Sequence, residues 1–239
     1  MVSVVAHRGF SGKYPENTKL AFEKALALNV EMVEFDVQLS QDRQLIVIHD
    51  PTVDRTSDGT GKIEELTLAE IKALDAGSWF APQFRGQRFL TFQEALDLLA
   101  GQVRLNIHIK AEEHNREEIV PQVVGEMKRR ELFATAFVAS DEQSLVLAKK
   151  LAPQLEICNL STEPTETYIQ RSQQIGCKII QPGNWQVDQK FMAQAHKSGL
   201  EVNPFYADDD AEMRRLIDCG VDGILTNHPD LLLDLRKKL

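Results

Sequence analysis

The residues best suited to chemistry lie at or near the ends of three short apolar segments. His7 and Arg8 follow a short apolar run close to the N-terminus. Glu34 and Asp36 lie within a second apolar segment, and His49 closes a third. In α/β folds, active sites are built at the carboxyl ends of strands. Two histidines, an arginine and a carboxylate pair suit metal-assisted attack on a phosphate ester.

The two carboxylates are expected to share one face of a strand. Side chains alternate along a strand, so Glu34 and Asp36 point to the same side and their apolar neighbours to the other. Burying two like charges a few ångströms apart is costly unless a cation lies between them. A hard divalent ion, Mg²⁺ or Ca²⁺, would meet this need. The alternative is that the carboxylates pair with Arg8 and Lys110 and hold no metal.

A further segment, 103–109, carries polar residues at the same spacing. Asn106, His108 and Lys110 share one face, while the intervening residues are apolar. Three inward polar side chains mark a site rather than a plain core. Lys110 is a candidate to hold phosphate oxygens together with Arg8.

The histidines His7 and His49 form a candidate proton-transfer pair. An ordinary histidine pKa of about 6.5 allows either role near neutral pH. One would activate the attacking oxygen, and the other would protonate the leaving alkoxide. The sequence leaves open which histidine is the acid and which is the base.

The segments that must position these residues alternate along the chain between strand-like and helix-like patterns of apolar residues. We predict eight strands near 2–6, 31–38, 103–109, 135–139, 155–160, 177–181, 200–205 and 222–226. Helical patterns lie between them, at 17–28, 91–100, 115–131, 141–152, 164–175, 187–198 and 209–219, with Asn17, Thr91 and Ser140 as predicted N-caps. This alternation predicts an α/β fold, a (β/α)₈ TIM barrel. A doubly wound open sheet is the alternative, weakened because no Gly-x-Gly-x-x-Gly follows the first strand.

One interval interrupts this alternation. Residues 39–90 are too long for a simple connection and are predicted to be a small insertion over the barrel mouth. They contain a hairpin turn at 40–43, a Gly-rich stretch at 57–61 and a helix near 67–74. The aromatic residues at 79–84 could line a pocket or pack the insertion onto the barrel. We expect the whole chain, 1–239, to form a single domain.

Composition limits the partners of the chain. With 27 basic and 36 acidic residues, its formal charge is −9, which argues against nucleic acid and leaves a small phosphodiester possible. No apolar run is long enough for membrane insertion, and the three cysteines form no Cys-x-x-Cys pair. The first residues resemble no leader segment. A cytoplasmic location is therefore expected. The oligomeric state does not follow from the sequence.

Six motifs together resemble those of the glycerophosphodiester phosphodiesterase family. They are HRG, PENT, EFDV, HD, RTSDGTG and GVDGILT, at 7–9, 15–18, 34–37, 49–50, 55–61 and 220–226. The resemblance implies metal-dependent hydrolysis of a glycerophosphodiester to glycerol 3-phosphate and an alcohol. It implies that His7 and His49 are catalytic, that Glu34 and Asp36 bind the metal, and that Phe205 forms an aromatic wall for the substrate.

The chain departs from the family pattern at three places. His108 stands where the family has a glutamate metal ligand. It could ligate the metal and favour Mn²⁺, Co²⁺ or Zn²⁺, leave the ion to water, or act as a cation in its place. Asn227 replaces an aspartate, which keeps the hydrogen-bonding shape and loses the charge. Phe205-Tyr206 replaces Trp-Thr.

Two other functions are compatible with these departures. The first is a lysophospholipase D-type reaction on a lipid-bearing glycerophosphodiester, for which Trp79, Phe80 and Phe84 would form an open apolar surface. The second is a catalytically weakened binding protein, which is suggested by His108 and Asn227. The retained histidines argue against a pure binder. Gln181 and Asn203, near strand ends, could bind substrate hydroxyls.

Overall fold

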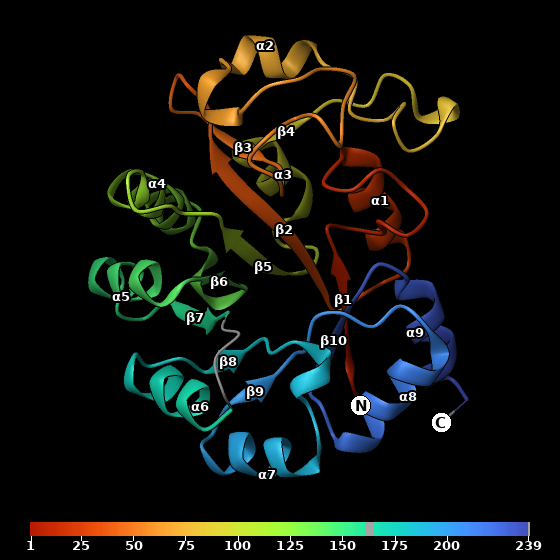
Figure 1. The fold of residues 1–239 in the computed structure, drawn as a ribbon, viewed down its shortest axis with the longest axis vertical. Coiled ribbons are helices and arrows are strands. Elements are labelled where there is room, and N and C mark those ends of the chain that lie inside the picture. The colour runs from red at the N-terminus through yellow and green to blue at the C-terminus, as the bar shows by residue number, and fades with distance from the viewer. Residues whose placement is uncertain (161–164, 239) are drawn as a thin grey trace.

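The structure, a computed structural model, describes residues 1–160 and 165–238 and forms a parallel barrel (Figure 1). The neighbouring strands follow the order β10-β1-β2-β5-β6-β7-β8-β9. Backbone hydrogen bonds between 202–204 and 222–225 close the ring between β9 and β10. The strands are β1 (Ser3–His7), β2 (Met32–Leu39), β5 (Arg104–Ile109), β6 (Ala136–Ser140), β7 (Glu156–Asn159), β8 (Ile179–Ile180), β9 (Glu201–Val202) and β10 (Gly223–Thr226). The predicted (β/α)₈ barrel is confirmed, and all eight predicted strands form.

Helices follow the barrel strands and pack around the outside of the sheet (Figure 1). They are α1 (Lys19–Ala27), α3 (Phe92–Leu99), α4 (Arg116–Arg129), α5 (Glu142–Leu151), α6 (Thr165–Gln174), α7 (Gln189–Lys197), α8 (Asp210–Cys219) and α9 (Pro229–Arg236). The first seven correspond to the predicted helices. The first residue predicted for the fifth of them, 164, lies outside the described residues.

The insertion after β2 forms its own small layer. Two short strands, β3 (Leu45–Val47) and β4 (Leu90–Thr91), extend the sheet in antiparallel fashion from β2. Arg43, with φ of 61°, makes the left-handed turn of the hairpin. The helix α2 (Leu68–Ala73) begins with a capping box between Thr67 and Glu70. Its buried face packs onto Ile46 and neighbouring apolar residues of the insertion.

Two predicted N-caps are wrong by one residue. The Thr91–Glu94 capping box forms at the start of α3. At α1 the cap is Thr18 instead of Asn17, because Asn17 turns inward to Asp36. At α5 the cap is Asp141, whose carboxylate accepts two helix N–H groups, while the predicted cap Ser140 donates to a backbone carbonyl.

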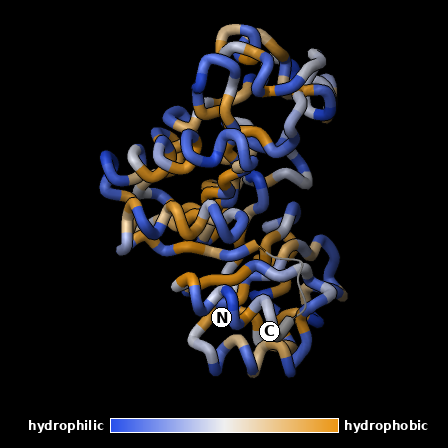
Figure 2. Tube along the Cα trace, turned by 60° about the vertical axis from the view of Figure 1, so that its left-hand side comes forward, coloured by the Kyte–Doolittle hydropathy of each residue, from blue (hydrophilic) through white to orange (hydrophobic). Residues whose placement is uncertain are grey.

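Apolar side chains fill both faces of the barrel sheet. The larger cluster lies between strands and helices, and a smaller one, which includes Val5, Phe137 and Leu225, fills the barrel interior. In Figure 2 the hydrophobic stretches run through the middle of the trace, whereas peripheral loops are mainly hydrophilic. Among the described residues, no helix combines the length and the apolar character needed to cross a membrane.

Candidate active site

The pairing of β2 with β5 brings the predicted metal ligands side by side. In this parallel register Glu34 is opposite Asn106, and Asp36 is opposite His108. Phe35, between the carboxylates, points outward and packs against the rings of neighbouring helices. The predicted alternation is therefore present, and it directs both carboxylates and His108 into the barrel.

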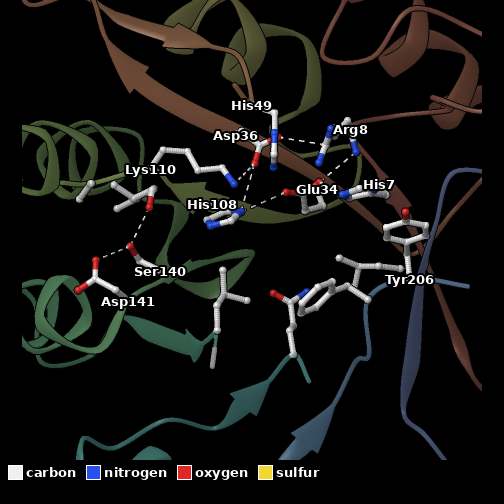
Figure 3. Close-up of a pocket in the computed structure, with 16 residues that line it drawn as sticks. His7, Arg8, Glu34, Asp36, His49, His108, Lys110, Ser140, Asp141 and Tyr206 are labelled. Carbon is white, nitrogen blue, oxygen red and sulfur yellow. Dashed lines mark hydrogen bonds and ion pairs between the residues drawn. The ribbon is translucent and has the colours of Figure 1, made fainter. Parts of the chain in front are cut away.

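One cavity of about 520 Å³ collects the predicted site residues at the C-terminal ends of the barrel strands (Figure 3). All eight residues predicted to act in the site line it: His7, Arg8, Glu34, Asp36, His49, His108, Lys110 and Phe205. They come from β1, β2, β5, the insertion and the segment after β9. Leu160, Gln181 and Leu225 complete the far wall.

The buried centre of the cavity is formed by Glu34, Asp36 and His108. Their candidate ligand atoms all lie within 4.8 Å of one another. Glu34 and Asp36 are only 3% and 1% exposed. His108 Nδ1 lies 3.1 Å from Asp36 Oδ1 and 3.9 Å from Glu34 Oε1.

The electrostatics of this centre suit a cation. Burial and the nearby Asp36 raise the pKa of Glu34 to about 8, so its charge is poorly compensated by the protein alone. Burial opposes ionisation of Asp36, but Lys110 and His108 outweigh it and hold its pKa well below the usual range. Within the described residues, the buried Asp36 Oδ1 receives no well-directed hydrogen bond. Burial also lowers the pKa of His108 to about 4, which leaves a neutral imidazole able to donate a lone pair. The donor set therefore fits a divalent metal.

A left-handed turn after β1 positions Arg8 beside the carboxylates. Arg8 and Gly9 have φ of 55° and 79°. The turn points the Arg8 backbone N–H at Glu34 Oε2, 3.0 Å away. The guanidinium donates to Glu16 at 2.8 Å, and its Nε lies 3.4 Å from Asp36. Lys110 Nζ lies 3.2 Å from the other oxygen of Asp36. Two cations thus bracket the buried carboxylate at the cavity wall.

His7 lies on the opposite side of Glu34 from His108 (Figure 3). Its Nε2 is 3.9 Å from Glu34, and its Nδ1 is 2.8 Å from Asn227 Oδ1. The ring stacks on Tyr206, with centroids 5.6 Å apart and an interplanar angle of 17°. Burial and the positive Arg8 lower the pKa of His7 to about 4. The imidazole is therefore neutral at neutral pH.

The insertion supplies His49 and the ion pairs that hold it. His49 Nδ1 lies 2.6 Å from Asp50. Arg55 donates to Asp50 and to Glu16, and its guanidinium lies over the ring of Trp79. Arg55 and His49 lower the pKa of Asp50 to about 2, so this partner is an ionised carboxylate. His49 is thus oriented through Nδ1, which leaves Nε2 for the cavity.

The aromatic residues of the insertion divide between packing and lining. Trp79 and Phe84 each pack edge-on against Phe80, and Phe84 also contacts Tyr14. Phe80 also lines a second cavity of about 350 Å³, which shares His7, Arg8 and Tyr206 with the first. Trp79 and Phe84 therefore pack as one alternative expected, and Phe80 lines a cavity, while binding of a substrate head group by this segment stays a prediction.

Two contributors to the site are not identifiable from the sequence as such. Tyr206 stands out there only as a departure from the family pattern, yet its ring covers His7. Asp208 binds Asn227, the partner of His7, but it lies in a run of three aspartates that is typical of a helix start. No local pattern distinguishes it from its neighbours.

With this geometry established, the chain can be compared with known proteins. The model of the Glycerophosphoryl diester phosphodiesterase family matches residues 7–231, and the chain belongs to that family. It is 36% identical to the glycerophosphodiester phosphodiesterase of Caldanaerobacter subterraneus, over 98% of both chains. It is 30% identical to that of Bacillus subtilis, over 99% of this chain and 87% of the relative.

A solved structure agrees with this assignment. The phosphodiesterase from Oleispira antarctica, described in complex with the product sn-glycerol-3-phosphate, superposes with a TM-score of 0.92. It is 27% identical to this chain and covers 98% of it and 96% of its own length. The protein is accordingly a glycerophosphodiester phosphodiesterase, and the comparisons do not support the alternative of a catalytically weakened binding protein.

Proposed function

We propose that this enzyme hydrolyses a glycerophosphodiester to glycerol 3-phosphate and an alcohol, with a divalent metal and with His7 and His49 as the proton-transfer pair. The observation that carries the proposal is the anchoring of both rings through Nδ1, to Asn227 and to Asp50. Each Nε2 is thereby left for the cavity that also holds the carboxylates. The product reported for the Oleispira relative supports the same product here.

The metal would be held by Glu34, Asp36 and His108 and would polarise the phosphoryl oxygen as a Lewis acid. Two carboxylates alone suit Mg²⁺ or Ca²⁺. The imidazole of His108 shifts the preference toward Mn²⁺, Co²⁺ or Zn²⁺. Arg8 and Lys110 would bind the remaining phosphate oxygens and stabilise the charge that develops on them.

The proton transfers follow from the two anchored histidines. One Nε2 accepts the proton of the attacking hydroxyl as the new P–O bond forms. The other gives a proton to the oxygen of the leaving alcohol as its bond to phosphorus breaks. We further propose that the attacking group is the neighbouring glycerol hydroxyl, giving a cyclic phosphate that water opens. Phe205, at the cavity wall, would pack against the carbon atoms of the glycerol.

A metal add-back assay tests this function. Glycerol 3-phosphate release from glycerophosphocholine is measured after chelation and separate addition of Mg²⁺, Ca²⁺, Mn²⁺, Co²⁺ or Zn²⁺. The proposal predicts no release without metal and restored release with at least one ion. Full activity of the chelated enzyme would contradict metal dependence. A panel of other head groups then defines the alcohol.

The cyclic route has its own test. Rapid-quench analysis should detect a cyclic phosphate, and a 2-deoxy analogue should not be cleaved. Normal cleavage of that analogue without any cyclic species would show direct attack by water.

A lipid-bearing substrate remains a second candidate because of exposed aromatic rings near the mouth. Trp185 and Tyr206 are 70% and 48% exposed. The residues predicted for this role are Trp79, Phe80 and Phe84. These rings are only partly exposed, and Phe80 contacts both of the others. Comparing lysophosphatidylcholine with glycerophosphocholine in the same assay decides between the two substrates.

A further inference from the structure

The side of His7 that faces away from Glu34 is held by a short chain of hydrogen bonds. His7 Nδ1 lies 2.8 Å from Asn227 Oδ1. Asn227 Nδ2 donates to Asp208 Oδ2 at 2.6 Å. The other oxygen of Asp208 accepts the Asn227 backbone N–H at 2.8 Å and the Thr226 hydroxyl at 3.1 Å. Both oxygens of Asp208 therefore accept hydrogen bonds from residues at the C-terminal end of β10.

The carboxylate of Asp208 determines which way the Asn227 amide points. An ionised carboxylate only accepts hydrogen bonds, so the NH₂ group of Asn227 must face it. The carbonyl oxygen then faces His7, and it also accepts a hydrogen bond of 2.7 Å from the Ser11 hydroxyl. Because an amide oxygen cannot donate, His7 Nδ1 must carry the proton in this contact. The lone pair of the neutral ring is consequently on Nε2, the nitrogen nearer Glu34.

We propose that Asp208 and Asn227 are positioning residues that together hold His7 in the tautomer with Nδ1 protonated and Nε2 free. The inference rests on the proposed function of His7 in proton transfer. The family pattern places a carboxylate at residue 227, beside the histidine. In this chain the carboxylate belongs to Asp208, which is linked to His7 through the amide of Asn227. Its task in this chain is to orient an amide, and the amide orients the ring.

The variant Asp208→Asn should reverse the chain of hydrogen bonds. The new amide at residue 208 would keep its oxygen on the backbone N–H of residue 227 and on Thr226, and its NH₂ group would face Asn227. The amide of Asn227 would then rotate its oxygen toward residue 208 and its NH₂ group toward His7. A donor facing Nδ1 selects the opposite tautomer, with the proton on Nε2. A wrong histidine tautomer lowers turnover by several orders of magnitude in other enzymes. We expect kcat to fall by at least about 100-fold, with a much smaller change in KM.

Exchanging the two residues should restore the pattern. Asn227→Asp alone puts two carboxylates within hydrogen-bonding distance and should impair turnover through their repulsion. The double variant Asp208→Asn/Asn227→Asp again has a donor facing an acceptor, and an acceptor facing His7 Nδ1. It should recover most of the kcat lost by each single variant. A purely structural role of either residue does not predict rescue by exchange.

The tautomer itself is measured by ¹⁵N NMR of the protein labelled at its histidines, in the absence of substrate. The signals of His7 are identified as those missing from the spectrum of the His7→Gln variant. The wild type and the exchanged double variant should show Nδ1 protonated, and Asp208→Asn should show Nε2 protonated. Asp209→Asn, which removes the charge of the N-cap of α8 but keeps an oxygen able to cap the helix, is the matched control and should leave both the tautomer and kcat unchanged. If Asp208→Asn does not fold, Asn227→Ala should still lose the fixed tautomer and kcat.

Three results would overturn the proposal: an unchanged tautomer in Asp208→Asn, an unchanged kcat in that variant, or an exchanged variant as impaired as the single ones. The tautomer is read without substrate, so it is independent of the proposed function. That function fails separately if His7→Gln turns over at the wild-type rate.

Discussion

His49 Nδ1 lies 2.6 Å from the carboxylate of Asp50, and Arg55 donates two hydrogen bonds, of 2.6 and 3.1 Å, to that same carboxylate. His7, by contrast, has a neutral amide as its partner. The two histidines proposed to transfer protons, His7 and His49, are therefore held by different kinds of partner. A carboxylate partner stabilises the imidazolium form, whereas an amide partner does so less strongly.

This relationship predicts the effect of Asp50→Asn. Burial lowers the pKa of His49, and the hydrogen bond to Asp50 opposes this shift. The change keeps the size of the side chain but removes the charge that favours protonation of His49. We expect kcat to fall by roughly 10- to 100-fold, with little change in KM. Steady-state kinetics on glycerophosphocholine measure both parameters. The control is Asp54→Asn, because Asp54 binds the Gly61 backbone and lies outside the site. Equal kcat values for Asp50→Asn and wild type would show that the ion pair only stabilises the insertion.

Replacing His108 by glutamate should change which metal binds best. A third carboxylate makes the centre harder and more negative, so affinity for Ca²⁺ and Mg²⁺ should rise relative to Zn²⁺ and Co²⁺. Isothermal titration calorimetry of the protein, after its metal has been removed with a chelator, gives the affinity for each metal ion without any turnover. His114→Glu serves as the control, because His114 is exposed and binds Glu64. An unchanged order of metal affinities in His108→Glu would show that residue 108 is not a ligand.

We expect Gln181 to strengthen substrate binding without stabilising the fold in the absence of substrate. It is 2% exposed and lines the main cavity, and its Nε2 has no hydrogen-bond partner among the described residues. A buried unpaired donor costs about 1–3 kcal/mol, so a substrate hydroxyl that pairs with it would gain affinity. Gln181→Leu should raise KM by about 10-fold. Its free energy of unfolding in urea should be equal to or higher than that of the wild type. Lower stability combined with an unchanged KM would contradict this role.

The insertion should lose stability in acid through Asp75. This carboxylate accepts the backbone N–H groups of Gly77, Ser78 and Gly86 at 2.6–2.8 Å. Burial opposes its ionisation, but the three donors outweigh burial and lower its pKa to about 2. Since the unfolded value is about 3.9, the stabilisation is complete above roughly pH 4–5 and is lost as the pH falls toward 2.

Asp75→Ala measures this contribution. At pH 7 we expect a loss of about 2 kcal/mol or more in the free energy of unfolding, because buried backbone donors lose their acceptor. The difference from wild type should shrink as urea titrations are taken down to pH 3. Asp54→Ala, at an exposed site with one backbone contact, should have a smaller effect. A difference between Asp75→Ala and wild type that stays constant with pH would refute a role for the ionised carboxylate.

Much of the fold could be predicted from periodicity, because strands and helices of a barrel alternate along the chain. The inward direction of Glu34, Asp36 and His108 also followed from alternation alone. The contacts of Asp208 and Tyr206 could not be predicted, because they join β10 and the segment after β9 to β1 across the closure of the barrel. Local signals at Asn17 suggest a helix cap, whereas its amide binds Asp36 in the tertiary structure.

The central claim is that both histidines transfer protons, and a leaving-group comparison tests it most directly. We would measure kcat/KM of His7→Gln and His49→Gln on glycerophosphocholine and on the p-nitrophenyl ester of glycerol 3-phosphate. We predict that each variant loses about 10²–10⁴-fold on the choline ester. The variant lacking the general acid should recover on the nitrophenyl ester, whose leaving group needs no proton, and the other variant should not. Wild-type rates in either variant on the choline ester would contradict proton transfer by both histidines.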